Sequence, residues 1–166
     1  MESMPSDLST LLRATIEHEL PALLAVSDAA ASLHPTPDAW SPKEELGHLI
    51  DSATNNHVRF VLAAIQPELR GPSYAQNEWV SLHGYDSMPW NRIVDFWFSY
   101  NMLLVDLIAR IPAEKLSLTC MVGDGPACTL AFLIEDYVLH LKHHVDHMLQ
   151  REKITVYPSQ KAASAR

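Results

Sequence analysis

Apolar residues recur every three or four positions through the segment EDYVLHLKHHVDHMLQ (135–150) and the turn before it. This spacing places them on one face of an α-helix, and no proline or glycine interrupts the pattern. The stripe comprises Leu130, Leu133, Ile134, Tyr137, Val138, Leu141, Val145 and Met148. A helix with one apolar face must bury that face against other elements, so this segment constrains the whole fold.

Three further segments carry the same spacing, and they predict helices over residues 7–32, 41–66 and 89–110. Pro21 is expected to kink the first of them. The second has the clearest start, because Ser41 and Glu44 form a capping box with Pro42 at the first helical position. Four amphipathic helices predict an all-α fold, a four-helix bundle.

Length and composition indicate one globular domain. The chain has 166 residues, of which 48% are hydrophobic and 19% charged. We expect the domain to span residues 1–158 and a mobile polar tail to span 159–166. The net charge of −8 and the lack of a basic cluster disfavour a nucleic-acid partner. Without an apolar run of 18 residues or a signal-peptide pattern, we expect a cytoplasmic protein with no membrane partner.

Two connections and two cysteines complete the outline. Residues 67–87 form a long connection, and residues 113–128 read as irregular, with Thr129 as the cap of the last helix. Cys120 and Cys128 are too few for a disulfide framework. We expect two reduced thiols, in preference to a loop clip or a redox pair.

Four of the nine histidines lie in the last helix, where they form two pairs spaced four residues apart. In a helix such a pair lies on one face, about 6 Å apart between Cβ atoms, and can hold one metal ion. His140 and His144 border the apolar stripe and face a neighbouring helix, whereas His143 and His147 point toward solvent. We therefore predict His140 and His144 as ligands. The alternative is a polar helix face that is rich in histidine by chance.

A third ligand would have to come from another helix. His48 lies outside the apolar stripe of the second helix, so it is either an exposed histidine or part of a face that lines an open cleft. It lies about 10 Å from the start of its helix, and His140 and His144 lie about 12 Å from the end of theirs. These levels coincide only if the two helices are antiparallel. An up-down-down-up bundle meets this condition, and the connection 67–87 could supply the crossover between helices two and three.

Several polar residues have a structural and a functional interpretation. Asp136 lies one turn before His140 and is our first choice for a carboxylate that orients an imidazole, ahead of Asp51 and Glu45. Each of the three is otherwise a surface charge. Glu19, near the apolar face of the first helix, is expected to be a satisfied polar group rather than part of a cleft. His57 lies within an apolar stripe and is expected to be a hydrogen-bonded core histidine.

Three motifs in order, WSPKEELGHLIDS (40–52), PSYAQNEWVSLHGY (72–85) and DYVLHLKHHVDHM (136–148), resemble the DinB superfamily of DinB/YfiT-like metalloenzymes. The similarity covers nearly the whole chain. It implies an up-down-down-up bundle, a homodimer and a divalent metal, usually nickel or zinc. One histidine of the second helix and a pair on the fourth would hold the metal, which here means His48, His140 and His144.

Two positions depart from the family pattern. His147 stands where the family commonly has glutamine, which brings a fourth imidazole close to the expected site. Ala75 stands where an aspartate often follows the tyrosine of the middle motif, so any role of that acid is missing.

Three neutral imidazoles suit zinc, nickel, copper or iron(II), with manganese a further option, and they leave a coordination position open. A thiol or water bound there has a lowered pKa. Resemblance to thiol-dependent S-transferases, which use bacillithiol or mycothiol, and to maleylpyruvate isomerases implies a metal-dependent transferase. Such an enzyme would activate a small thiol for attack on an electrophile. The alternatives are a metal-dependent hydrolase, a non-catalytic metal-binding or stress-response bundle, and a bundle that has lost its metal.

Overall fold

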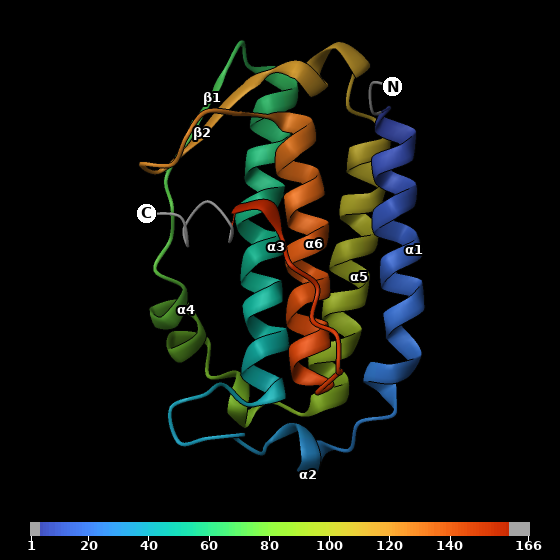
Figure 1. Cartoon of the computed structure of the whole chain (residues 1–166), viewed down its shortest axis with the longest axis vertical. Helices are drawn as coiled ribbons and strands as arrows, with labels where there is room; N and C mark the ends of the chain where they lie inside the picture. The colour runs from blue at the N-terminus through green and yellow to red at the C-terminus, as the bar shows by residue number, and fades with distance from the viewer. Residues whose placement is uncertain (1–3, 160–166) are drawn as a thin grey trace.

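The computed structural model describes residues 4–159. Its four long helices are α1 (Pro5–Leu24), α3 (Pro42–Ile65), α5 (Trp90–Ala109) and α6 (Leu130–Met148). They form a bundle in which α1 packs on α5 and α6, and α3 also packs on α5 and α6. Figure 1 shows α1 and α6 running down and α3 and α5 running up. The up-down-down-up prediction is therefore confirmed, and α3 is antiparallel to α6.

The crossover between α3 and α5 is more ordered than predicted. It contains β1 (Leu69–Gly71), α4 (Gln76–His83) and a 3-10 turn, η1 (Tyr85–Ser87). Gly84 ends α4 with a φ of +62°, a left-handed conformation that glycine adopts without strain. Figure 1 shows this segment descending beside α3 from one end of the bundle to the other.

The prediction that residues 113–128 are irregular was wrong. They form the 3-10 turn η2 (Ala113–Ser117) and strand β2 (Thr119–Val122), and a turn over residues 123–127 leads to β3 (Cys128–Thr129). β2 pairs in parallel with β1 and antiparallel with β3, where Cys120 lies opposite Cys128. Both cysteines are free thiols, as expected. The strands are two to four residues long, and β2 pairs with a segment about fifty residues earlier in the chain, so no local sequence pattern predicts them.

The helix boundaries follow their caps. Ser41 and Glu44 form the predicted capping box, and the Thr129 hydroxyl accepts the backbone N–H of Phe132. The first predicted helix was too long. It ends at Leu24, and Ser27 caps the separate short helix α2 (Asp28–Ala31). Pro21 lies inside α1, and the N–H of Ala25 still bonds to its carbonyl.

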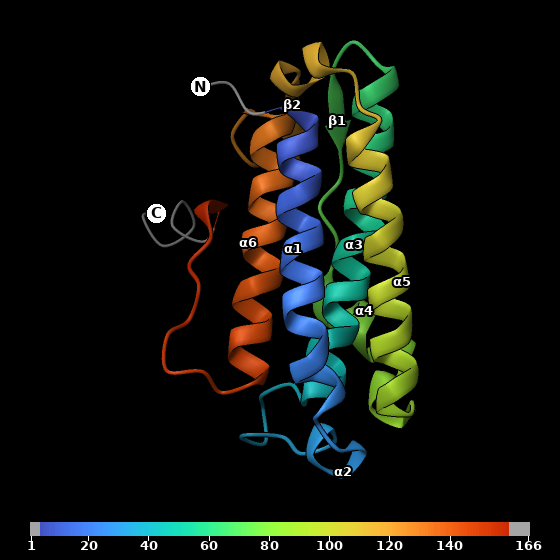
Figure 2. The same ribbon diagram turned by 90° about the vertical axis from the view of Figure 1, so that its right-hand side faces the viewer.

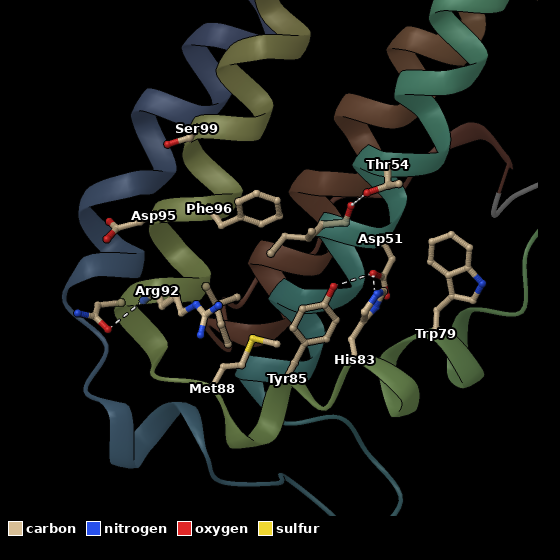
Figure 3. Close-up of a pocket in the computed structure, with 13 residues that line it drawn as sticks. Asp51, Thr54, Trp79, His83, Tyr85, Met88, Arg92, Asp95, Phe96 and Ser99 are labelled. Carbon is tan, nitrogen blue, oxygen red and sulfur yellow. Dashed lines mark hydrogen bonds and ion pairs between the residues drawn. The ribbon is translucent and has the colours of Figure 1, made fainter.

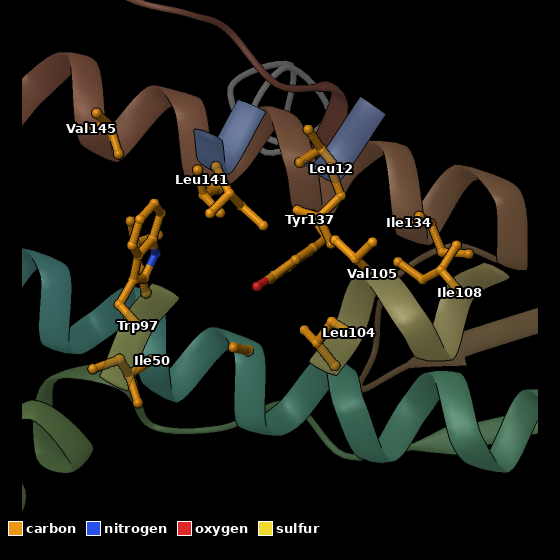
Figure 4. Close-up of a cluster of buried hydrophobic side chains, with 14 of the residues drawn as sticks. Leu12, Ile50, Trp97, Leu104, Val105, Ile108, Ile134, Tyr137, Leu141 and Val145 are labelled. Carbon is orange, nitrogen blue, oxygen red and sulfur yellow. The ribbon is translucent and has the colours of Figure 1, made fainter. Parts of the chain in front are cut away.

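Apolar side chains of all four long helices fill the centre of the bundle. Figure 4 shows Leu12 of α1, Ile50 of α3, Trp97 and Leu104 of α5, and Leu141 of α6 among them. One polar pair crosses this core, because the Tyr137 hydroxyl donates to the side-chain oxygen of Asn101 at 2.5 Å. Across the described residues, no helix combines the length and hydropathy needed to span a membrane.

Glu19 has the structural interpretation that was expected. Its side chain is buried, and Arg151, just after α6, donates to both of its carboxylate oxygens, at 3.1 and 2.5 Å. The same guanidinium donates to Asp146. The pair ties the end of α6 to α1.

Candidate metal centre

The antiparallel packing of α3 on α6 brings three predicted side chains together. One ring nitrogen each from His48, His140 and His144 lies within 4.8 Å of the others. The Nε2 atoms of His48 and His140 are 3.2 Å apart. A tetrahedral ion with Zn–N bonds of about 2.0–2.1 Å would hold its ligand nitrogens roughly 3.3 Å apart. The spacing between the two helices therefore suits a single small divalent ion.

His48 is not on a solvated face. Its side chain is 1% exposed, and the Trp40 ring, from the loop before α3, lies 5.0 Å from it between centroids. The interpretation of His48 as an exposed histidine was wrong because the loop before α3 covers this part of the helix. Nδ1 of His48 is buried and has no hydrogen-bond partner within the described residues.

Burial keeps the three imidazoles neutral. It lowers the pKa of His48 and of His144 to about 3 and lowers the pKa of His140 well below the ordinary value. Neighbouring imidazoles disfavour the charged forms further, since a second positive charge in a buried cluster is repelled. Neutral imidazole has a free lone pair, which is the form that a metal ligand needs.

Glu45, one turn before His48, orients one of the rings. Its Oε1 lies 2.9 Å from Nδ1 of His144. With Nδ1–H donating to this carboxylate, Nε2 of His144 carries the lone pair. Burial raises the pKa of Glu45 to about 7. Glu45, ranked behind Asp136 from the sequence, is thus the carboxylate that reaches an imidazole of the cluster.

Asp136 has another role. Its oxygens accept the backbone N–H and the hydroxyl of Ser159, at 2.8 and 2.7 Å. Ser159 ends a segment, residues 151–159, that turns back after α6 and runs along its outer side (Figure 2). We call this segment the C-terminal strap. Of the tail predicted over 159–166, residues 160–166 lie outside the described residues.

The strap adds a side chain to the candidate metal centre that could not be predicted from the sequence. The Tyr157 ring lies 5.1 Å from the ring of His140 and 5.2 Å from that of His143. The carbonyl of Thr155 accepts from Nδ1 of His143 at 2.7 Å. No spacing rule connects residue 157 with residue 140, because the strap reverses direction between them.

The other histidines of α3 and α6 contribute no nitrogen to this cluster, although the ring of His143 lies 5.2 Å from that of His144 between centroids. His147 is exposed, as predicted, whereas His143 is half-buried under the strap, so the prediction of a solvated His143 was wrong. His57 is half-buried rather than in the core, and its Nδ1 lies 3.0 Å from the Tyr100 hydroxyl. The prediction that His57 is hydrogen-bonded is confirmed.

The lowered pKa of His48 predicts how the metal-free protein responds to acid. An unfolded imidazole has a pKa of about 6.5, so between this pH and about pH 3 the unfolded chain binds a proton that folded His48 does not bind. This contribution destabilises the fold as the pH falls, and His48→Ala removes it. The unfolding free energy of the variant should therefore rise relative to that of the metal-free wild type when the pH is lowered from about 7 to about 4.5. Urea unfolding at the two pH values measures the difference, and a difference that does not change with pH would contradict the burial of His48.

Comparison with known proteins identifies related sequences. The sequence model of the DinB superfamily, a protein family, matches residues 11–148 of this chain. The protein named "Putative metal-dependent hydrolase BH0277" from Halalkalibacterium halodurans is 25% identical over 113 residues, 68% of this chain and 66% of that protein. "Putative metal-dependent hydrolase BCAH820_2714" from Bacillus cereus is 25% identical over 114 residues, 69% of this chain and 65% of that protein. The chain thus matches slightly less than two thirds of the length of these relatives.

Two solved structures share the fold. YfiT from Bacillus subtilis, described as "a probable metal-dependent hydrolase with an unusual four-helix bundle topology", superposes with a TM-score of 0.77 at 18% identity and covers 90% of this chain and 89% of YfiT. A mycothiol-dependent maleylpyruvate isomerase superposes with a TM-score of 0.68 at 14% identity, over 85% of this chain and 59% of that protein. At these identities the similarity concerns the fold alone.

Proposed function

This chain belongs to the DinB superfamily, and from that premise we propose that it is a divalent-metal enzyme with His48, His140 and His144 as the ligands. The observation that carries the proposal is the convergence of three neutral imidazoles from two antiparallel helices. The names of the relatives, which refer to metal-dependent hydrolases, support it. Three imidazoles suit several divalent ions, and the family resemblance favours zinc or nickel, with iron or manganese as alternatives.

A divalent ion held by these residues would supply a Lewis acid that lowers the pKa of a small thiol or of water. Glu45 holds the His144 ring and its tautomer through the bond to Nδ1. Trp40 and Tyr157 lie against His48 and His140 and shield them from bulk water. Three protein ligands would leave a coordination position for a substrate, in the manner of a catalytic rather than a structural site.

The reaction that we favour is transfer of a low-molecular-weight thiol to an electrophile. Its support is the shared fold with a mycothiol-dependent isomerase and the nitrogen-only ligand set, which suits a metal that also binds sulfur. Hydrolysis by metal-activated water is the second candidate, since the relatives carry the name hydrolase. The homodimer and the cytoplasmic location implied above remain predictions; sedimentation would test the first.

The test is an assay of untagged, zinc- or nickel-loaded protein with bacillithiol, mycothiol, glutathione or cysteine and the electrophile monochlorobimane. We expect thiol-dependent conjugate formation that His48→Ala abolishes. Turnover of a phenyl ester without added thiol would favour the hydrolase instead. Metal-loaded protein that turns over neither would support a non-catalytic metal-binding bundle and contradict the enzyme.

Glu45→Gln should weaken metal binding without disturbing the fold. Glutamine can still accept a hydrogen bond from His144 Nδ1, but it lacks the charge that makes the imidazole a better ligand. Removing such a partner typically costs about 10- to 100-fold in metal affinity. Competition with a chromophoric chelator measures the affinity. Asp136→Asn is the matched control, because Asp136 contacts Ser159 instead of a ligand, and equal losses in the two variants would exclude the role assigned to Glu45.

A further inference from the structure

A recess lies between α3, α4, η1 and α5, with a volume of about 770 Å³. This is within the range of small-molecule sites. None of the three clustered histidines lines it. Its lining includes Asp51, His83, Tyr85, Met88, Arg92 and Phe96 (Figure 3).

One wall of the recess is held rigidly by hydrogen bonds. Asp51, 1% exposed, accepts the Tyr85 hydroxyl at 2.7 Å, and its Oδ1 lies 3.0 Å from Nδ1 of His83. The Tyr85 ring also packs directly on Gly47, where no other residue would fit, since a Cβ there would lie 2.1 Å from Cδ2 of Tyr85. This network joins α3 to α4 and η1, so the wall exists before any ligand binds.

The opposite wall, on α5, is apolar and open to solvent. Phe96 is 56% exposed, a large fraction for an aromatic side chain in a globular protein. Ile93, on the same helix, is a further apolar lining residue. A flat or branched apolar group that entered here would cover Phe96 and gain the free energy of removing its surface from water.

Arg92 supplies the only unpartnered cation among the described lining residues. Its side chain extends from α5 toward Met88 and Tyr85 (Figure 3). Its guanidinium makes no ion pair or hydrogen bond within residues 4–159, and its backbone N–H donates to the side-chain oxygen of Asn91 and to the carbonyl of Pro89. Oδ1 of Asp51 has two partners, whereas its Oδ2 is buried without a hydrogen-bond partner among the described residues, and the exposed Asp95 also lines the recess. The recess thus contains two carboxylates, and the guanidinium of Arg92 is the cation left to pair with an anionic ligand.

We propose that this recess binds a small organic carboxylate with an aromatic or branched apolar body. The carboxylate pairs with the guanidinium of Arg92, whose planar donors match it in a two-point bond. The body lies between Phe96 and the rigid wall formed by Tyr85 and Met88. The site is separate from the metal centre and does not depend on the proposed function.

The experiment is calorimetric titration of the full chain with phenylacetate. The protein is freed of metal first, so that the carboxylate cannot bind at a metal ion. We expect saturable binding to one site, which weakens as salt is added. Phenethylamine, with the opposite charge, and 2-phenylethanol, with none, should bind at least tenfold more weakly. Arg92→Gln should weaken phenylacetate binding about tenfold or more.

Matched variants separate the recess from other surfaces. Arg110→Gln, at the end of the same helix, and Leu103→Ala, an exposed apolar residue outside the recess, should leave affinity unchanged, whereas Phe96→Ala should reduce it. His140→Ala should not change the affinity of the metal-free chain for phenylacetate. Three results would each overturn the proposal: unchanged affinity in Arg92→Gln, equal binding of phenethylamine, or no saturable binding of phenylacetate to a folded wild-type chain.

Discussion

His140→Ala is expected to leave the purified protein almost free of metal. The Nε2 atom of His140 lies 3.2 Å from that of His48, and both nitrogens belong to the cluster within 4.8 Å. Multi-ligand zinc sites bind with about 10–16 kcal/mol, so one lost ligand of three or four should weaken binding by a hundredfold or more. Elemental analysis after dialysis at fixed free zinc measures the loss, and His48→Ala should behave in the same way.

The control is His143→Ala, three residues along the same helix. His143 bonds to the carbonyl of Thr155 and contributes no atom to the cluster. It should therefore retain wild-type metal content. If His143→Ala released the ion while His140→Ala kept it, the outward pair would be the binding site and the assignment made here would be wrong.

Arg151→Ala should be the most destabilising single change away from the core. Glu19 is 1% exposed and receives hydrogen bonds from both terminal nitrogens of Arg151, and Asp146 receives one. Without the guanidinium, two buried carboxylates lose their cation. Breaking such a pair typically costs about 3–5 kcal/mol, and the partial exposure of Arg151 places this case near the lower end. Urea unfolding of the metal-free protein measures the change.

A second substitution identifies the cause. Adding Glu19→Gln to Arg151→Ala removes the stranded charge and should restore part of the lost free energy. Arg110→Ala, which removes only an exposed hydrogen bond to the carbonyl of Asp106, should cost less than about 0.5 kcal/mol. A loss in Arg151→Ala no larger than this would show that Glu19 does not depend on the pair.

Features that depend on contacts between residues close in the chain could be predicted from the sequence. The helix starts at Ser41 and Thr129 were correct because a cap is a contact between residues three positions apart. The bundle topology followed from matching the depth of His48 to that of His140, given a connection long enough for a crossover. The end of α1 was missed because Ser27, which is itself an N-cap, was read as part of a continuous helix.

Contacts between distant segments could not be predicted in this way. Nothing near Glu45 in the chain shows that it faces His144, which is 99 positions away. Asp136 has the better spacing to His140, yet the strap occupies its carboxylate. The burial of His48 depends on Trp40, and Tyr157 reaches His140 only because the chain reverses after α6. These side chains complete the candidate site, and a three-dimensional arrangement was needed to find them.

The most direct measurement is anomalous X-ray diffraction from crystals of untagged protein loaded with zinc or nickel. Our account predicts one strong anomalous peak per chain, between the Nε2 atoms of His48, His140 and His144. A peak beside His143 and His147, or no peak in crystals soaked with excess metal, would contradict it.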